Sequence, residues 1–195
     1  MSPAAPPVLL ATERLHLVLL PPDAAARVLA YHEANREHLG AVSPARPDNF
    51  FTVTWWRSRL AQDAEDWRLG LSLRLFLLPR EASLTSAPVL GSASLNDIRR
   101  GPLQSCELGF GLDHRHEGQG LMTEALRAVC DYAFGPMALH RLQANHLPEN
   151  RRSAAVLARL GFQTEGLARE LVCIEGRWRD HVLTALLAPA EASAS

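Results

Sequence analysis

The sequence predicts an α+β fold, in which a mixed, largely antiparallel sheet carries helices on both faces. The 195 residues are enough for one domain with a substantial core. Strand-like and helix-like segments follow one another without an internal repeat, and the last two strands are joined by a tight turn at Glu175-Gly176. We expect a single domain over residues 9–187, with a disordered N-terminus at 1–8 and a flexible tail at 188–195.

The first third of the chain predicts one strand and two helices. Leucines at 15, 17 and 19 alternate with His16 and Val18, which indicates a strand that ends at Pro21-Pro22. Asp23 then caps a helix through about His38. The segments that follow are a loop over 44–49, a second helix over 54–66 and a long leucine-rich strand over 67–78.

The remaining elements alternate between strands and helices. A turn-prone stretch over 79–88 leads to two strands at 89–96 and 105–112, which are separated by a turn at Gly101-Pro102. An amphipathic helix from about Gly120 to Phe134, a short strand over 141–145 and a helix over 149–160 come next, and Gly161 ends that helix. Two strands over 162–174 and 178–187 complete the order β-α-α-β-β-β-α-β-α-β-β.

The run Arg115-His116-Glu117-Gly118-Gln119-Gly120 stands directly before the amphipathic helix. Glycines at the start of a helix let backbone N–H groups approach a ligand that a Cβ would push away. The unpaired N–H groups and the positive end of the helix suit a pyrophosphate, and Arg115 adds a planar cation. The run therefore predicts a site for a phosphate-bearing cofactor.

Two well-known phosphate motifs do not fit this run. The dinucleotide fingerprint needs a third glycine, where this chain has Thr123, and a P-loop needs a lysine, which the chain lacks altogether. The run does fit the pattern Arg/Gln-x-x-Gly-x-Gly/Ala, and in this it resembles the coenzyme A signature of the Gcn5-related N-acetyltransferases (GNAT).

Other segments extend the resemblance over roughly residues 9–187. The segment from Ala144 to Asn150, with Arg152-Ser153 and Leu160-Gly-Phe162, resembles the part of the superfamily that follows the cofactor helix. The runs Thr12-Glu-Arg-Leu-His-Leu-Val18 and Glu175–Leu186 are similar to the RimJ/RimL branch, the ribosomal-protein-alanine N-acetyltransferases.

The resemblance implies the GNAT fold and an enzyme that transfers acetyl from acetyl-CoA to an α-amino group. The acceptor it implies is the N-terminal alanine or serine of a ribosomal protein. It also implies that the strand 109–112 carries a bulge and exposes its backbone to the cofactor arm. The residues implied to contact the cofactor are Phe110, Gly111, Leu112, Arg115, His116, Glu117, Gly118, Gln119, Gly120, Leu121, Asn150 and Ser153.

For the proton transfers, the resemblance implies Glu107 as the base, acting directly or through water, and Ser153 as the acid. Many superfamily members have a tyrosine acid at the position of Leu157, whereas the ribosomal-protein branch uses a serine in an Asn-x-x-Ser element, here Asn150 to Ser153. Alternatives stay open for each residue. Glu107 could be a solvent-side strand residue, Asn150 and Ser153 could serve only the helix terminus, and Gly109 and Gly111 could merely relieve packing.

Composition and charge argue against nucleic-acid binding, membrane insertion and metal binding. A net charge of −1 argues against sequence-independent nucleic-acid binding. The three isolated cysteines and the proline-rich start predict a cytoplasmic protein. No run of residues approaches eighteen consecutive apolar positions, so no membrane span is expected. His114 and His116 have no evident third ligand, so no metal is expected.

The alternative acceptor is a small-molecule amine such as a polyamine, aminoglycoside or amino acid. A non-catalytic CoA-binding scaffold and a homodimer also stay open.

Overall fold

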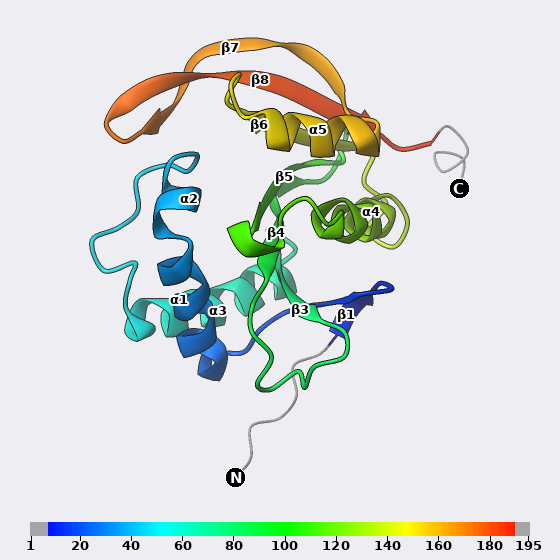
Figure 1. Ribbon diagram of the computed structural model, residues 1–195. Coiled ribbons are helices and arrows are strands. Elements are labelled where there is room, and N and C mark those ends of the chain that lie inside the picture. The colour runs from blue at the N-terminus through cyan, green and yellow to red at the C-terminus, as the bar shows by residue number, and fades with distance from the viewer. Residues whose placement is uncertain (1–7, 190–195) are drawn as a thin grey trace.

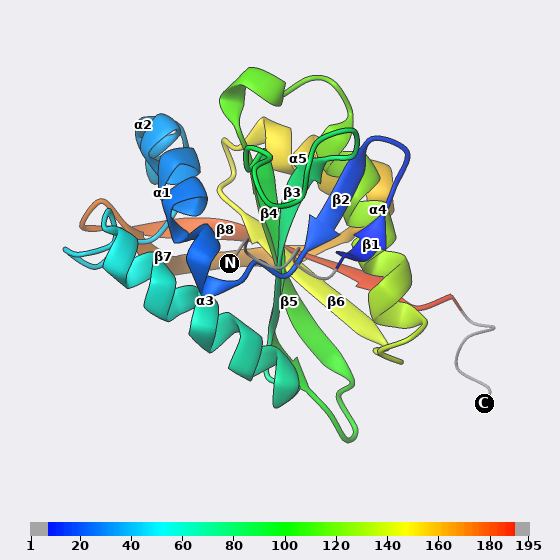
Figure 2. The same ribbon diagram turned by 90° about the horizontal axis from the view of Figure 1, so that it is seen from below.

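An eight-stranded sheet separates two layers of helices in the computed structural model, which describes residues 8–189 (Figures 1 and 2). Across the sheet the strands lie in the order β1-β2-β3-β4-β5-β6-β8-β7. Only the neighbours β5 and β6 are parallel among the described strands. The predicted mixed, largely antiparallel sheet is therefore confirmed. The strands are β1 Val8–Ala11, β2 Leu15–Val18, β3 Leu73–Pro79, β4 Gly91–Arg99, β5 Ser105–Leu112, β6 Arg141–His146, β7 Gln163–Ile174 and β8 Arg177–Leu187.

Helices cover both faces of the sheet, as the sequence predicts (Figure 2). One layer holds α1 Ala25–Ala34, α2 Arg36–Gly40 and α3 Val53–Arg68, and the other holds α4 Leu121–Phe134 and α5 Arg151–Leu160. Each layer packs on its own cluster of buried side chains. Short 3-10 turns, η1 Pro22–Ala24 and η2 His114–His116, precede α1 and α4.

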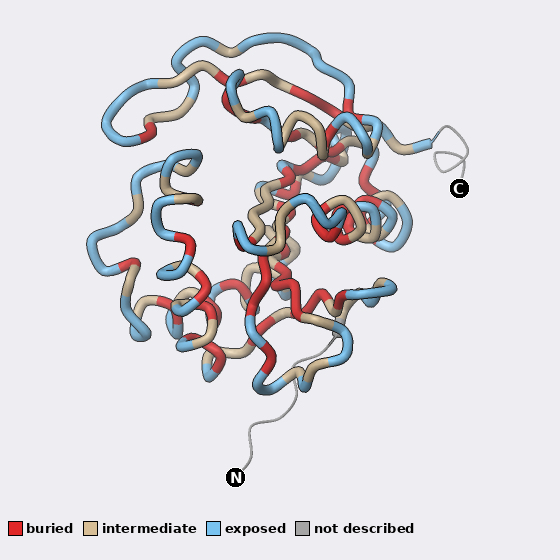
Figure 3. The backbone as a smooth tube through the Cα atoms, viewed as in Figure 1, coloured by how far each residue is buried: buried red, intermediate tan, exposed pale blue. Residues whose placement is uncertain are grey.

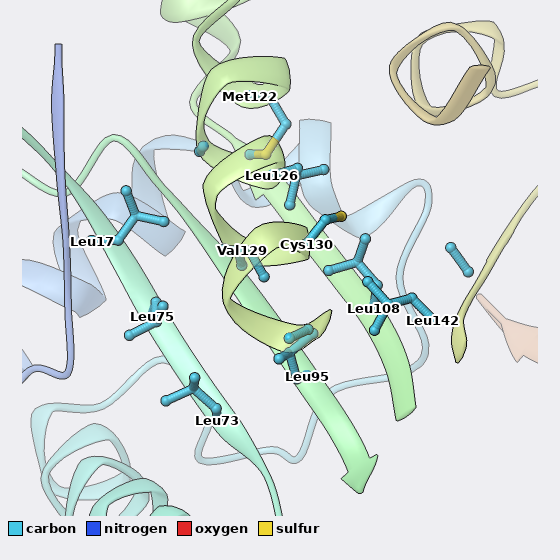
Figure 4. Close-up of a cluster of buried hydrophobic side chains, with 14 of the residues drawn as sticks. Leu17, Leu73, Leu75, Leu95, Leu108, Met122, Leu126, Val129, Cys130 and Leu142 are labelled. Atoms are coloured by element: carbon cyan, nitrogen blue, oxygen red, sulfur yellow. The ribbon is translucent and has the colours of Figure 1, made fainter. Parts of the chain in front are cut away.

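Helix α4 supplies much of the larger cluster because its apolar residues recur at helical spacing. In Figure 4, Met122, Leu126, Val129 and Cys130 face leucines of the central strands. The buried residues of the helix are Leu121, Met122, Ala125, Leu126, Val129, Cys130 and Ala133. Burying one such large side chain stabilises the fold by roughly 1.5–3 kcal/mol, so this stripe fixes α4 and the loop that enters it.

Burial is greatest in the central strands and falls toward the edge strand β7 (Figure 3). The β7–β8 pairing is irregular between Ala168 and Val172, and Glu170 within this bulge has φ of 50°. Asp180 accepts a hydrogen bond from the Glu170 N–H at 2.8 Å. Asp180 therefore orders the final hairpin.

Three elements differ from those predicted. The helix expected from Asp23 to about His38 is interrupted at Asn35, whose φ of −115° separates α1 from α2. The strand expected from Trp67 starts only at Leu73, because α3 continues to Arg68 and Gly70, at φ of +70°, terminates it. The short strand β1 was not predicted.

The two chain ends lie only partly within the described residues. Residues 1–7, which we predict to be disordered, and residues 190–195, which we predict to be flexible, lie outside the described residues. Val8, which we placed in the terminus, begins β1. The Ala188 N–H donates to the His140 carbonyl at 2.9 Å.

Candidate active site

The sheet opens between β5 and β6, directly beside the loop that leads into α4. The two strands pair only from Ser105 to Glu107 on one side and from Arg141 to Gln143 on the other. Beyond Glu107, β5 continues to Leu112 with β4 as its paired neighbour. The β6-facing edge of Leu108–Leu112 thus leaves backbone groups free of a strand ladder, where an extended ligand could hydrogen-bond. We call this opening the fork.

Strand β5 has no bulge at 109–112, so the predicted bulge is wrong. Pairing of β5 with β4 is regular from Glu107 to Leu112, and its irregularity lies between Asn96 and Arg99 of β4. The separation of two parallel strands, not an inserted residue, therefore frees the backbone of β5.

The loop before α4 contains two glycines in the left-handed conformation. Gly118 has φ of 75° and Gly120 has φ of 77°. A Cβ on Gly118 would meet no atom of the described chain within 4 Å, so the space beside it is open. Helix α4 starts at Gly120 without a capping side chain, which leaves its first N–H groups for a ligand. This geometry fits an anion held by the backbone, as a pyrophosphate would be.

The cation beside this loop is fixed by a buried carboxylate. Asp113 caps η2 and accepts hydrogen bonds from Arg115 Nη2 at 2.5 Å and Nε at 3.0 Å. The hydrogen bonds from the Arg115 side chain hold the pKa of Asp113 well below its usual range. The Arg115 side chain is 63% exposed, so it remains at the rim of the loop although it is paired.

Glu117 connects the loop to helices of both layers. One carboxylate oxygen lies 3.1 Å from His38 Nε2 of α2, and the other lies 2.7 Å from Arg152 Nη1 of α5. The loop and the first turn of α5 are therefore neighbours, which brings together two groups of predicted site residues that lie far apart in the sequence.

The first turn of α5 presents Ser153. The Asn150 side chain accepts a hydrogen bond from the Ser153 backbone N–H at 3.1 Å and so caps the helix. The capping alternative thus holds for Asn150, whereas the half-buried Ser153 hydroxyl has no hydrogen-bond partner among residues 8–189. Leu157, one turn further on, is fully within the core.

Glu107 lies apart from this group, on the other face of the sheet. Its neighbours Cys106 and Leu108 point into the core beneath α4, so alternation directs Glu107 away from α4 and α5. It occupies the last paired position before the fork, opposite Gln143, and its side chain is 52% exposed. Arg99 Nη2 lies 3.6 Å from its carboxylate. The structure thus places the two predicted proton-transfer residues on opposite faces of the fork.

The other predicted site residues follow the same strand and loop. Phe110 and Leu112 are half-buried against the core, and Leu121 is buried. Gln119 is exposed, and its carbonyl accepts a hydrogen bond from Arg14. His116 Nδ1 lies 3.9 Å from Asp113.

Packing accounts for the missing side chains at two β5 glycines. A Cβ on Gly109 would lie 2.9 Å from Ser94 Oγ, and one on Gly111 would lie 3.3 Å from Leu39 Cδ2. These spaces are filled by other side chains, which supports the packing alternative for both glycines.

Sequence reasoning missed four residues that hold the loop: Arg14, Asn35, His38 and Asp113. Asn35 Oδ1 accepts from the His114 N–H at 3.0 Å, and Arg14 Nη1 donates to the Gln119 carbonyl at 2.9 Å. The contacts of Arg14 lie about a hundred residues further along the chain, so the sequence shows the run Thr12-Glu-Arg14 only as part of the family resemblance. Beside the loop is a cleft of about 620 Å³, lined by Arg14, Leu15, Pro79, Pro88, Val89, Leu90, Asp113, Arg115, His116 and Leu121.

Residues 8–189 contain neither a candidate membrane span nor a candidate metal cluster. No helix there is both long and apolar enough to cross a membrane. No group of three or more histidine, cysteine, aspartate or glutamate side chains there is placed to hold a metal ion.

Comparison with known proteins agrees with the GNAT resemblance. The family model described as an acetyltransferase (GNAT) domain matches residues 14–163. The [ribosomal protein uS5]-alanine N-acetyltransferase of Escherichia coli (strain K12) is 36% identical over 184 residues, which cover 94% of this chain and 93% of that protein.

Solved structures of related proteins share the fold. The ribosomal-protein-S5-alanine acetyltransferase from Vibrio fischeri has a TM-score of 0.86 and 31% identity, covering 93% of this chain and 97% of that one. Mycobacterium smegmatis RimJ in complex with CoA-disulfide has a TM-score of 0.82 and 28% identity, covering 93% of this chain and 84% of that one.

Proposed function

Because this chain belongs to the GNAT acetyltransferase family and is an N-acetyltransferase, we propose that it acetylates the N-terminal amine of a ribosomal protein beginning with alanine or serine, using acetyl-CoA. The observation that carries the proposal is the likeness to the uS5-alanine enzyme, which spans nearly the whole of both chains. The fork and the loop before α4 support the proposal, because they would receive the cofactor arm and its phosphates.

The loop before α4 fits the phosphate end of acetyl-CoA. Its two left-handed glycines present backbone N–H groups, and Gly118 leaves open the space that a Cβ would fill. Residues 115–121 would hold the pyrophosphate, with Arg115 and Arg152 as the nearby cations. When bound, acetyl-CoA supplies the acetyl group and a thiolate as leaving group.

The fork gives the two substrates separate approaches. The free backbone edge of β5 would orient the cofactor arm through residues 110–112, and Asn150 would contact it from α5. The acceptor amine would approach from the face that carries Glu107. This arrangement supports direct transfer between two bound substrates, without an acetylated side chain.

Two side chains would move the protons. The amine nitrogen would attack the thioester carbonyl while Glu107, directly or through water, takes its proton. As the C–S bond breaks, the Ser153 hydroxyl would donate its proton to the departing thiolate and recover one from water. An N-terminal amine has a pKa of about 8, against about 10.4 for a lysine amine, so it needs less help to become neutral. An α-amino acceptor would therefore demand less of Glu107 than a lysine acceptor would.

Release of free CoA tests the proposal directly. Purified protein is supplied with acetyl-CoA and a peptide that begins with alanine and contains one internal lysine. The control is the same peptide with its N-terminus blocked. We expect turnover only with the free N-terminus, and mass spectrometry should place the acetyl group there. Binding of acetyl-CoA without turnover on either peptide would reject the α-amino acceptor and favour a small amine or a non-catalytic scaffold.

A further inference from the structure

Arg14 joins the turn between β1 and β2 to the loop before α4. Its Nη1 donates to the Gln119 carbonyl at 2.9 Å. Its Nε and Nη2 both lie 2.6 Å from Glu124 Oε2, and its backbone N–H donates to Glu124 Oε1 at 2.9 Å. One guanidinium thus contacts both the loop and the first turn of α4.

The loop itself has little packing to hold it. Residues 118–120 are exposed, and the neighbouring cleft of about 620 Å³ lies against Arg14 and Leu121. Among residues 8–189, the one atom that a Cβ on Gly120 would meet within 4 Å is Arg14 Nη2, at 3.6 Å. The conformation of Gln119-Gly120 therefore depends on a few hydrogen bonds, among which the one from Arg14 fixes a backbone carbonyl.

Fixing that carbonyl also fixes the next amide. In a trans peptide the C=O and the following N–H point in opposite directions. Since the Gln119 carbonyl points to Arg14, the Gly120 N–H must point away from Arg14, on the other side of the loop. We infer that Arg14 is a positioning residue, which aims the Gly120 N–H at the pyrophosphate of acetyl-CoA. This inference rests on the proposed cofactor site and is independent of the acceptor.

Glu124 holds Arg14 in this geometry. Burial alone would raise the pKa of Glu124, but hydrogen bonds from Thr12 and Arg14 outweigh it and lower the pKa. The carboxylate therefore stays charged at neutral pH. Because the Arg14 side chain is 45% exposed, its ion pair with Glu124 contributes little to the free energy of unfolding. The main effect of Arg14 is therefore on the conformation of the loop.

Arg14→Lys separates this role from a purely structural one. A lysine can still pair with Glu124, but one ammonium cannot span both Glu124 and the Gln119 carbonyl as the planar guanidinium does. Arg80→Lys is the matched control, because Arg80 donates to the Thr12 carbonyl in the same turn, and within residues 8–189 its side chain has no hydrogen bond or ion pair to the loop.

Calorimetric binding of CoA and of S-acetylpantetheine, which lacks the pyrophosphate, provides the readout. We expect Arg14→Lys to raise the Kd for CoA about three- to tenfold, to leave that for S-acetylpantetheine unchanged and to keep the melting temperature close to that of Arg80→Lys. Equal CoA affinities for the two variants, or equal weakening toward both ligands, would overturn the inference. Wild-type protein that binds CoA but acetylates no peptide would reject only the proposed acceptor.

Discussion

The carboxylate of Glu117 lies 2.7 Å from the guanidinium of Arg152 and so joins the loop before α4 to the first turn of α5. Both residues border the proposed phosphate site. A cation that pairs with a carboxylate in the free protein must give up that pair to bind a phosphate fully. Glu117 therefore competes with the ligand for Arg152.

Removing each charge should shift cofactor affinity in opposite directions. We expect Glu117→Gln to lower the Kd for acetyl-CoA about two- to fivefold, and Arg152→Gln to raise it by a similar factor. In the double-mutant cycle, Arg152→Gln should cost more affinity in the Glu117→Gln background than in wild type. Arg151→Gln, an equal charge change on the adjacent exposed residue, is the control. Matching effects at 151 and 152 would indicate a general charge effect in place of competition.

The glycines of the loop permit a second matched comparison. Gly118 and Gly101 have φ of 75° and 67°, and a Cβ at either position would meet no atom within 4 Å. Valine at each should therefore lower the free energy of unfolding similarly, by about 1–2 kcal/mol of backbone strain. Only Gly118→Val should also raise the Kd for acetyl-CoA, by about tenfold or more, because its side chain enters the phosphate site. Similar acetyl-CoA affinities for the two variants would remove the loop from the binding site.

The elements that the sequence predicted well are those with a strong local pattern. Strand β5 was predicted at 105–112, and α4 within one residue, because apolar alternation and helical spacing are both local signals. The same reasoning failed at the end of α3. Leu69 and Leu71 continue the alternation of the following strand, yet both are 53% exposed and lie before it.

The site was only partly predictable for a related reason. The glycine loop and the Asn150–Ser153 element are short motifs that the sequence displays directly. The fork depends on where two strands separate, and the contacts Arg14–Gln119 and Glu117–Arg152 join residues that are distant in sequence. Such pairings appear only once the sheet order is known.

Ser153 can be replaced without removing the cap of α5. The cap is the Asn150 side chain, so Ser153→Ala should leave stability nearly unchanged, whereas Asn150→Ala should cost about 1 kcal/mol. If the hydroxyl protonates the leaving sulfur, Ser153→Ala should lower kcat about 10- to 100-fold with little change in the Kd for acetyl-CoA. An unchanged kcat at saturating substrates would discard the acid role.

Asp113 should make stability depend on pH in the acid range. Its pKa in the folded protein is depressed, mainly by hydrogen bonds from the Arg115 side chain, below the value of about 3.9 expected for an unfolded chain. Its contribution is thus complete above about pH 5 and is lost as the pH falls toward the folded pKa. Asp113→Asn should lower the unfolding free energy at pH 7 by about 1–3 kcal/mol and weaken its decrease between pH 5 and 3. Urea unfolding at several pH values measures both, and parallel pH curves for wild type and variant would contradict this assignment.

Glu107 is the residue whose role most needs a control, because it also lies near Arg99. Asp97 lies 3.1 Å from the same arginine, so Asp97→Asn removes a comparable surface charge beside Arg99 and leaves the fork intact. We expect Glu107→Gln to lower kcat/KM for an alanine-initiated peptide about 10- to 100-fold at pH 6, where an amine with a pKa of about 8 is almost entirely protonated. The loss should shrink toward pH 9, where the amine is mostly neutral and needs no base. A flat ratio of variant to wild-type rates across this range, or the same profile for Asp97→Asn, would make Glu107 a surface residue of the strand.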